Sequence, residues 1–128
     1  MRQLADRPWV NWLMLAAWTG FIWFLSSRPS VPSAASDIAD YVVRQGGHLA
    51  LHFILFLLAW RAGVARWGRR WGSMFALVFA LANGVMDELY QLTVPGRSAN
   101  LEDVLTNTAG VLLAYGVVHF GKVGNRTQ

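Results

Sequence analysis

The sequence has 128 residues, enough for one domain, and it is too apolar for a typical soluble protein. Apolar residues make up 55% of the chain and charged residues 14%, whereas soluble domains carry about 25% charged residues. The absence of cysteine excludes disulfides and thiolate metal sites. The net charge of +4 comes from basic residues that flank apolar runs. This distribution is typical of membrane topology and argues against a nucleic-acid partner.

Four apolar runs, at about 9–25, 47–65, 71–92 and 101–120, approach the roughly 20 residues that a helix needs to cross a bilayer. A soluble helical bundle is the alternative, but it would need a polar face on each helix, and residues 9–25 have almost none. We therefore predict an all-α integral membrane protein with four transmembrane helices in a single domain over residues 1–128.

The first run could also be the core of a signal peptide, because Arg2 and Arg7 precede it and the small-residue stretch "PSAAS" follows. A signal core has about 7–15 apolar residues, and this run is longer, so we expect a retained anchor. The next segment, "SDIADYVVR" at residues 36–44, has apolar residues at helical spacing. We predict a short amphipathic helix there, on the outer membrane surface between the first and second spans.

Arginine positions predict the orientation. The link "RAGVARWGRRW" between the second and third spans carries four arginines, and such short basic links stay in the cytoplasm. With four spans, both termini are then cytoplasmic, and the segments 26–46 and 95–100 face outward.

Polar residues interrupt three of the four runs near their predicted outer ends. They are Arg44, His48 and His52 at the second span, Asn83, Asp87, Glu88 and Gln91 at the third, and Asn100, Asp103 and Asn107 with Gly110 at the fourth. Each group falls on one helix face by its spacing. A charge inside a membrane is costly and normally faces the bundle interior. We therefore expect one polar pocket in the outer leaflet.

Carboxylates and imidazoles in such a pocket are candidates for acid–base chemistry, and amides and a guanidinium are candidates for ligand binding. The acid–base candidates are Glu88, Asp87 and His52. The ligand-binding candidates are His48, Gln91, Arg97, Asp103 and Asn107. Carboxylates with histidines also fit a divalent metal ion, although no sequential metal motif is present and no other cofactor is evident.

"HFILF" together with "DELYQLTVPGRSANLEDVLTNTAG" resembles the VanZ-like family of small bacterial membrane proteins, named for a protein linked to low-level teicoplanin resistance. The matching motifs are H-F, D-E-x-x-Q, P-G-R and D-x-x-x-N-x-x-G, in this order through about residues 48–116. The resemblance implies a four-helix fold in the bacterial cytoplasmic membrane and a role in the cell envelope. One departure is that family members often carry Asp-Lys where this chain has His48 and Leu49, so only Arg44 could supply that cation.

Three functions stay open at this stage. The protein could bind the head group of a lipid or lipid-linked envelope precursor, which would fit a role in glycopeptide resistance. It could be a membrane hydrolase or transferase that acts on a lipid-linked phosphate or glycosyl bond. It could also be a structural subunit that acts through a second copy or another envelope protein. A transporter is disfavoured because the polar residues gather at one end of the helices.

Overall fold

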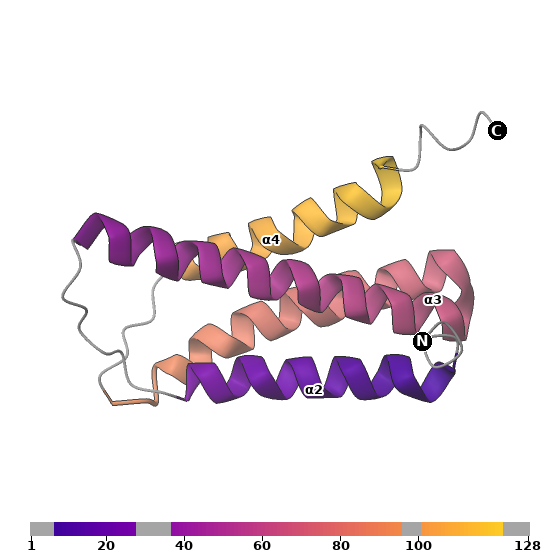
Figure 1. The fold of residues 1–128 in the computed structure, drawn as a ribbon, viewed down its shortest axis with the longest axis horizontal. Coiled ribbons are helices and arrows are strands. Elements are labelled where there is room, and N and C mark those ends of the chain that lie inside the picture. Colours follow the sequence, from indigo (N-terminus) through magenta and orange to yellow (C-terminus); the bar gives the residue numbers. More distant parts are fainter. Residues whose placement is uncertain (1–6, 28–36, 96–100, 122–128) are drawn as a thin grey trace.

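A computed structural model describes residues 7–27, 37–95 and 101–121, and these ranges are almost entirely helical. The helices, labelled as in Figure 1, are α2 (Pro8–Ser26), α3 (Asp37–Gln91) and α4 (Leu101–Phe120). No strand occurs among the described residues. The predicted all-α class is confirmed, and α4 has the bounds predicted for the last span.

Helix α3 folds back on itself at Gly68, so that it forms two arms that run side by side (Figure 1). We call residues 37–67 the first arm and residues 69–91 the second arm. Gly68 has φ 85° and ψ 173°, a backbone conformation that essentially only glycine adopts without strain. Near the fold, the Trp60 indole Nε1–H donates to Ser73 Oγ at 3.0 Å and joins the two arms.

Two predictions are corrected by this arrangement. Three helices among the described residues, α2, α3 and α4, are long and apolar enough to cross a membrane, rather than the four helices predicted. Helix α3 nevertheless runs the length of the molecule twice, once in each arm. The predicted spans 47–65 and 71–92 both lie in α3, because helix resumes directly after Gly68 without a loop. The predicted surface helix is helical but not a separate element, because residues 37–44 are the first turns of α3.

Helix α2 begins at Pro8, which suits the first helical position because its missing N–H would have no helical partner there. Two tryptophans tie α2 to α3. The Trp18 indole donates to the Leu51 carbonyl oxygen at 2.9 Å in the first arm, and the Trp23 indole donates to Asn83 Oδ1 at 3.3 Å in the second arm. Helix α2 therefore packs against both arms of α3.

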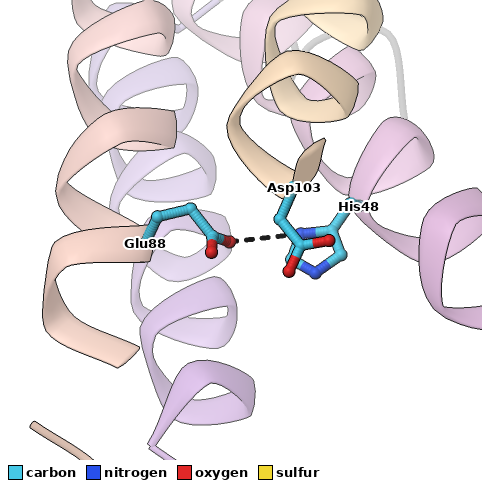
Figure 2. Close-up of side chains that lie close together, drawn as sticks. All are labelled: His48, Glu88 and Asp103. Atoms are coloured by element: carbon cyan, nitrogen blue, oxygen red, sulfur yellow. Dashed lines mark ion pairs between the residues drawn. The ribbon is translucent and has the colours of Figure 1, made fainter. Parts of the chain in front are cut away.

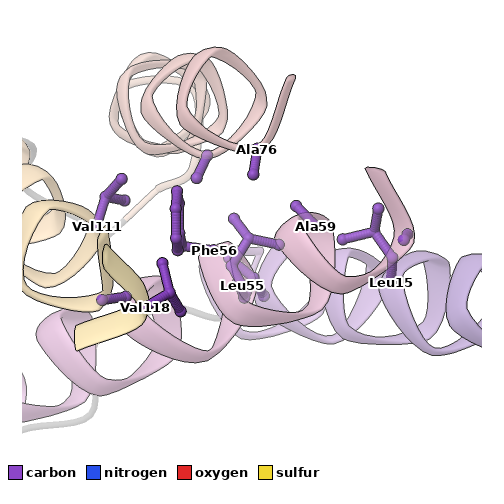
Figure 3. Packing of buried hydrophobic residues seen from close by; sticks show 11 residues of the cluster. Leu15, Leu55, Phe56, Ala59, Ala76, Val111 and Val118 are labelled. Carbon is purple, nitrogen blue, oxygen red and sulfur yellow. The ribbon is translucent and has the colours of Figure 1, made fainter. Parts of the chain in front are cut away.

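The apolar core lies between the arms of α3, with contributions from α2 and α4 (Figure 3). Leu55 and Phe56 are fully buried, and the alanines Ala59, Ala76 and Ala114 bring the helices close. Small residues at helix contacts are typical of membrane proteins, in which close van der Waals packing holds helices together.

The outer faces of the helices carry large apolar side chains that are exposed. Leu13, Val78 and Leu112 are all more than half exposed, at 59%, 65% and 53%. Soluble proteins rarely expose apolar surface on this scale. Apolar residues outside and polar residues inside are the arrangement that a lipid environment favours, which supports the membrane assignment.

Figure 1 also shows how the ends of the elements are distributed. The start of α2, the fold at Gly68 and the end of α4 lie at one end of the molecule. The starts of α3 and α4 and the ends of α2 and α3 lie at the other end, where the predicted polar residues are located. We call these the Gly68 end and the polar end.

Candidate functional site

The polar end contains a set of buried polar side chains from α2, both arms of α3 and α4. They are Ser26, His48, His52, Asp87, Glu88, Gln91, Asp103 and Asn107, and each is no more than 8% exposed. Burying so many polar groups within membrane-spanning helices is expensive unless they interact with one another or with a ligand. The predicted convergence of the polar stripes is therefore observed in the structure.

His48, Glu88 and Asp103 form the centre of this site, and we call them the carboxylate–imidazole cluster (Figure 2). One potential metal-ligand atom from each residue lies within 4.8 Å of the other two. His48 Nδ1 is 3.9 Å from Glu88 Oε1. The first arm, the second arm and α4 each supply one member of the cluster.

Asn107 orients the imidazole of His48. Its Oδ1 lies 2.9 Å from His48 Nδ1, and its Nδ2–H donates to the Gly84 carbonyl oxygen at 3.3 Å. Because a carbonyl can only accept, the second contact fixes the orientation of the amide, and Oδ1 then accepts a hydrogen bond from His48 Nδ1–H. The amide thus links α4 to both arms of α3.

The close approach of α4 to the first arm brings these residues together. A Cβ on Gly110 would lie 2.3 Å from the Leu49 carbonyl oxygen, a distance that no side chain tolerates. Asp103, Asn107 and Gly110 share one face of α4 by their spacing. The glycine therefore allows the backbones to touch, and the two polar residues on the same face are placed against His48.

A second group of polar residues supports Asp103 from the first arm. Gln45 Nε2–H donates to Asp103 Oδ1 at 2.8 Å, and the Thr106 hydroxyl donates to Gln45 Oε1. The Arg44 guanidinium is 4.0 Å from Asp103 Oδ1, and its side chain is 44% exposed. Arg44 therefore supplies a cation at the edge of the site, one turn before His48.

Asp87 and Gln91 face α2 rather than the cluster. The Ser26 hydroxyl donates to Asp87 Oδ1, and Gln91 Nε2–H lies 3.4 Å from Ser26 Oγ. Successive residues on the second arm point about 100° apart, so Asp87 and Glu88 reach different neighbours. The structure thus divides the predicted pocket into a part next to α2 and a part next to α4.

His52 lies one turn deeper in the first arm and is fully buried. Its Nδ1 is 2.9 Å from the His48 carbonyl oxygen, and because that oxygen can only accept, Nδ1 carries a proton. Its Nε2 has no hydrogen-bond partner among the described residues. In the neutral form of the ring, Nε2 then carries no proton and can accept one or bind a metal.

A cavity of about 310 Å³ opens between α2 and the two arms of α3. Its polar wall contains Ser26, Arg44, His48, Asp87 and Gln91, and its apolar wall includes Ile22, Leu25, Val43 and Leu51. A cavity with both kinds of wall can accommodate a molecule that is polar at one end and apolar at the other.

The predicted site residues thus occupy three positions relative to the cavity and the cluster. His48, Glu88 and Asp103 form the cluster, which Asn107 contacts through His48. Asp87 and Gln91 line the cavity towards α2, and His52 lies one turn after His48 in the first arm. Arg97 and the neighbouring Gly96 lie outside the described residues.

Sequence reasoning missed Gln45 and Ser26. Gln45 could have been found, because it is three residues before His48 on the same helix face.

A family model described as VanZ/LLP1 matches residues 11–122. The match covers most of the chain and confirms the resemblance based on the motifs at residues 48–116. No curated protein matches the chain, and no solved structure matches it either.

Proposed function

Because the chain belongs to the VanZ/LLP1 family, we propose that it is a cell-envelope membrane protein that binds the polar head group of a lipid or lipid-linked envelope precursor. The observation that supports this proposal is the cavity at the polar end, which has one polar and one apolar wall. The head group would contact the polar wall, and the first part of the hydrocarbon chain would contact Ile22, Leu25 and Leu51.

Arg44 is the residue that gives the cavity a preference for anions. Arg44 lines the cavity and its side chain is partly exposed, so its guanidinium can turn from Asp103 to an incoming phosphate. A guanidinium pairs with phosphate through two parallel hydrogen bonds. Gln91 and Ser26 would add hydrogen bonds to the head group, and Arg97 stays a predicted ligand-binding residue that could pair with the same phosphate.

The proposed location of this site is the outer leaflet of the bacterial cytoplasmic membrane. The arginines Arg66, Arg69 and Arg70 surround the Gly68 end, and the positive-inside rule places that end in the cytoplasm. The cavity at the polar end would then be accessible to envelope precursors. Binding such a precursor could change how a lipid-tailed glycopeptide reaches its target, which would account for low-level teicoplanin-type resistance.

Catalysis on the same ligand is a second candidate function, and His52 favours it. The unprotonated Nε2 of a fully buried imidazole is suited to accept a proton. Glu88 and Asp87, on adjacent residues of the second arm, are the other acid–base candidates. A hydrolase or transferase acting on a lipid-linked phosphate or glycosyl bond would use these groups.

A structural role in a larger envelope assembly is a third candidate. The hydrogen bonds Ser26–Asp87, Gln45–Asp103 and His48–Asn107 join all three helices, as a network that only fixes helix packing would do. The cavity distinguishes the candidates, because a network that serves packing alone does not need an open space with a cation at its edge.

Native mass spectrometry of the detergent-purified protein tests the proposal. The protein would be incubated separately with a polyprenyl phosphate, a polyprenyl diphosphate, phosphatidylglycerol and phosphatidylethanolamine. We expect wild type to retain a polyprenyl-linked phosphate in preference to phosphatidylethanolamine, and Arg44→Gln to lose most of that retention. Arg66→Gln is the matched control, because Arg66 is an exposed arginine near the Gly68 end that lies over the Trp67 ring.

Equal retention of all four lipids, or equal loss in both arginine variants, would reject a specific head-group site. Mass spectra recorded after longer incubation would distinguish binding from catalysis. A bound lipid that stays intact supports a binding protein. A lipid that is shortened by wild type but not by His52→Gln supports the enzyme.

A further inference from the structure

We infer that the carboxylate–imidazole cluster, formed by His48, Glu88 and Asp103, is a binding site for one divalent first-row transition metal ion such as Zn²⁺ or Mn²⁺. The three residues come from three different helical segments, and each is more than nine-tenths buried. A site of this kind would hold the first arm, the second arm and α4 together at the polar end.

The distances in the cluster are close to those of a metal site. Two ligands that are each about 2.1 Å from a common ion lie at most about 4.2 Å apart. His48 Nδ1 is 3.9 Å from Glu88 Oε1, and all three donor atoms lie within 4.8 Å of one another. Small rotations of the carboxylate groups are therefore enough to bring the donors around one ion.

Asn107 completes the set of donors around His48 Nδ1. Its Oδ1 is 2.9 Å from that nitrogen, which is about the spacing of two neighbouring ligands at right angles around an ion. The hydrogen on His48 Nδ1 would be lost when the ion binds, as is usual for metal-binding histidines. Without metal, His48 Nδ1 and Asn107 Oδ1 form a hydrogen bond. With metal, the same two atoms would be neighbouring ligands of the ion.

The chemistry of the donors selects the class of metal. One imidazole nitrogen with two carboxylates and an amide oxygen suits Zn²⁺, Mn²⁺ or Fe²⁺, whereas sites for Ca²⁺ and Mg²⁺ are built from oxygen alone. The absence of cysteine excludes thiolate ligands. The donors are deeply buried, but His48 also lines the cavity, which gives an ion a path of entry.

A second observation supports a ligand at this place. His52 is fully buried, and its Nε2 has no hydrogen-bond partner among the described residues. A Cβ added to Gly84 would lie 3.6 Å from His52 Cδ2, which is the carbon bonded to Nε2. The same added Cβ would lie 3.2 Å from Asn107 Cβ. The Cδ2 edge of this imidazole therefore lies near Gly84 and Asn107, next to the cluster, although His52 is not one of its three donors.

A bound ion would also explain how an acidic pocket can take an anionic head group. A phosphate in the cavity would lie close to the cluster carboxylates, and a divalent cation at the cluster would offset their charge. It could also coordinate a phosphate oxygen directly. This part of the inference rests on the proposed function, whereas the metal site itself does not.

Metal content of the purified protein provides the test. The chain would carry an affinity tag without histidine, be treated with EDTA in detergent, and be exposed to Zn²⁺, Mn²⁺ or Co²⁺ before desalting and elemental analysis. We expect about one ion per chain in wild type. Glu88→Gln and Asp103→Asn should lower the affinity at least about tenfold, since losing even a hydrogen-bond partner of a ligand costs about 10–100-fold.

His119→Gln is the matched control, because His119 lies near the end of α4 at the Gly68 end and should leave metal binding unchanged. Electron paramagnetic resonance of the Mn²⁺-loaded wild type gives a readout that does not depend on whether a variant folds. It should show coupling to an imidazole nitrogen. A folded wild type that binds no ion, or a bound ion without this coupling, would overturn the inference.

The two proposals fail in different ways. Lipid retention would be measured on EDTA-treated protein and on metal-loaded protein. An ion at the cluster without any retained lipid would support the metal site and reject the head-group site. Retention of a polyprenyl phosphate by protein that binds no ion would reject the metal site and support head-group binding by Arg44 alone.

Discussion

Asn107 on α4 links both arms of α3 at the site. Its amide accepts a hydrogen bond from His48 in the first arm and donates one to the Gly84 carbonyl in the second arm. Both contacts are buried, so neither can be replaced by water. An amide is well suited to this position because it can donate and accept at the same time without adding charge.

Replacing Asn107 by alanine should therefore lower the stability of the protein. The change leaves the His48 Nδ1–H without its partner and removes the second acceptor contact of the Gly84 carbonyl, which keeps its bond within the helix. One unsatisfied buried polar group costs about 1–3 kcal/mol. The free energy of unfolding, measured by denaturant titration in mixed micelles, should fall by about that amount. Thr108→Ala is the control, because the Thr108 hydroxyl only donates to Val104 within its own helix. Equal effects in the two variants would contradict the role of the amide.

Residues of the site were predictable where the helical spacing was already apparent. Asp103, Asn107 and Gly110 follow a helical repeat in a segment that was expected to be helix. Ser26 was not predictable, because it closes the site only through the packing of α2 against the second arm. Gln45 was missed for another reason. It precedes the predicted start of the second span, so its spacing of three residues from His48 was the one available signal, and the continuity of α3 places it beside Asp103.

At the level of helices, α3 shows what apolar periodicity can and cannot predict. The two apolar runs were recognised, and the link between them was correctly expected to be short. The link contains two glycines, Gly63 and Gly68, and sequence periodicity does not distinguish them. Only Gly68 has a positive φ. The reversal therefore takes place at a single residue, and the arginines around it stay helical.

The contact between α3 and α4 depends on Gly110, so Gly110→Ala should destabilise this pair of helices. A Cβ there would lie 2.3 Å from the Leu49 carbonyl oxygen, and backbone must move to relieve the clash. Overpacking of this kind costs about 1–3 kcal/mol, and the same movement would separate Asn107 from His48. Both the free energy of unfolding and the metal affinity of the cluster should decrease.

Gly116→Ala is the matched control for this prediction. A Cβ on Gly116, in the same helix, would meet its nearest atom at 4.0 Å, which is ordinary contact. Alanine should then stabilise the helix by about 0.5–1 kcal/mol, because glycine is the poorer helix former. If Gly116→Ala lost as much stability as Gly110→Ala, α4 would be sensitive to any substitution of glycine. The close approach of α4 to Leu49 would then not explain the effect of Gly110→Ala.

On the scale of the whole molecule, polar and apolar residues are distributed in the opposite way to a soluble protein. Large apolar side chains cover the outside, and carboxylates, imidazoles and amides are buried at one end. Basic residues gather at the other end, where Arg69, Arg70 and His119 line a separate cavity of about 550 Å³. This separation of charge along the long axis is what a fixed orientation in a membrane requires.

The orientation leads to a prediction that the chain is well suited to test, because it contains no cysteine. Ala65→Cys places a thiol near the Gly68 end, and Thr93→Cys places one at the polar end. Both positions are exposed. In intact cells, a membrane-impermeant maleimide should label Thr93→Cys, because the positive-inside rule predicts that the arginine-rich end is cytoplasmic. Ala65→Cys should be labelled only after the membrane is permeabilised. The reverse pattern would place the cavity on the cytoplasmic side, so its ligand would have to come from the inner leaflet.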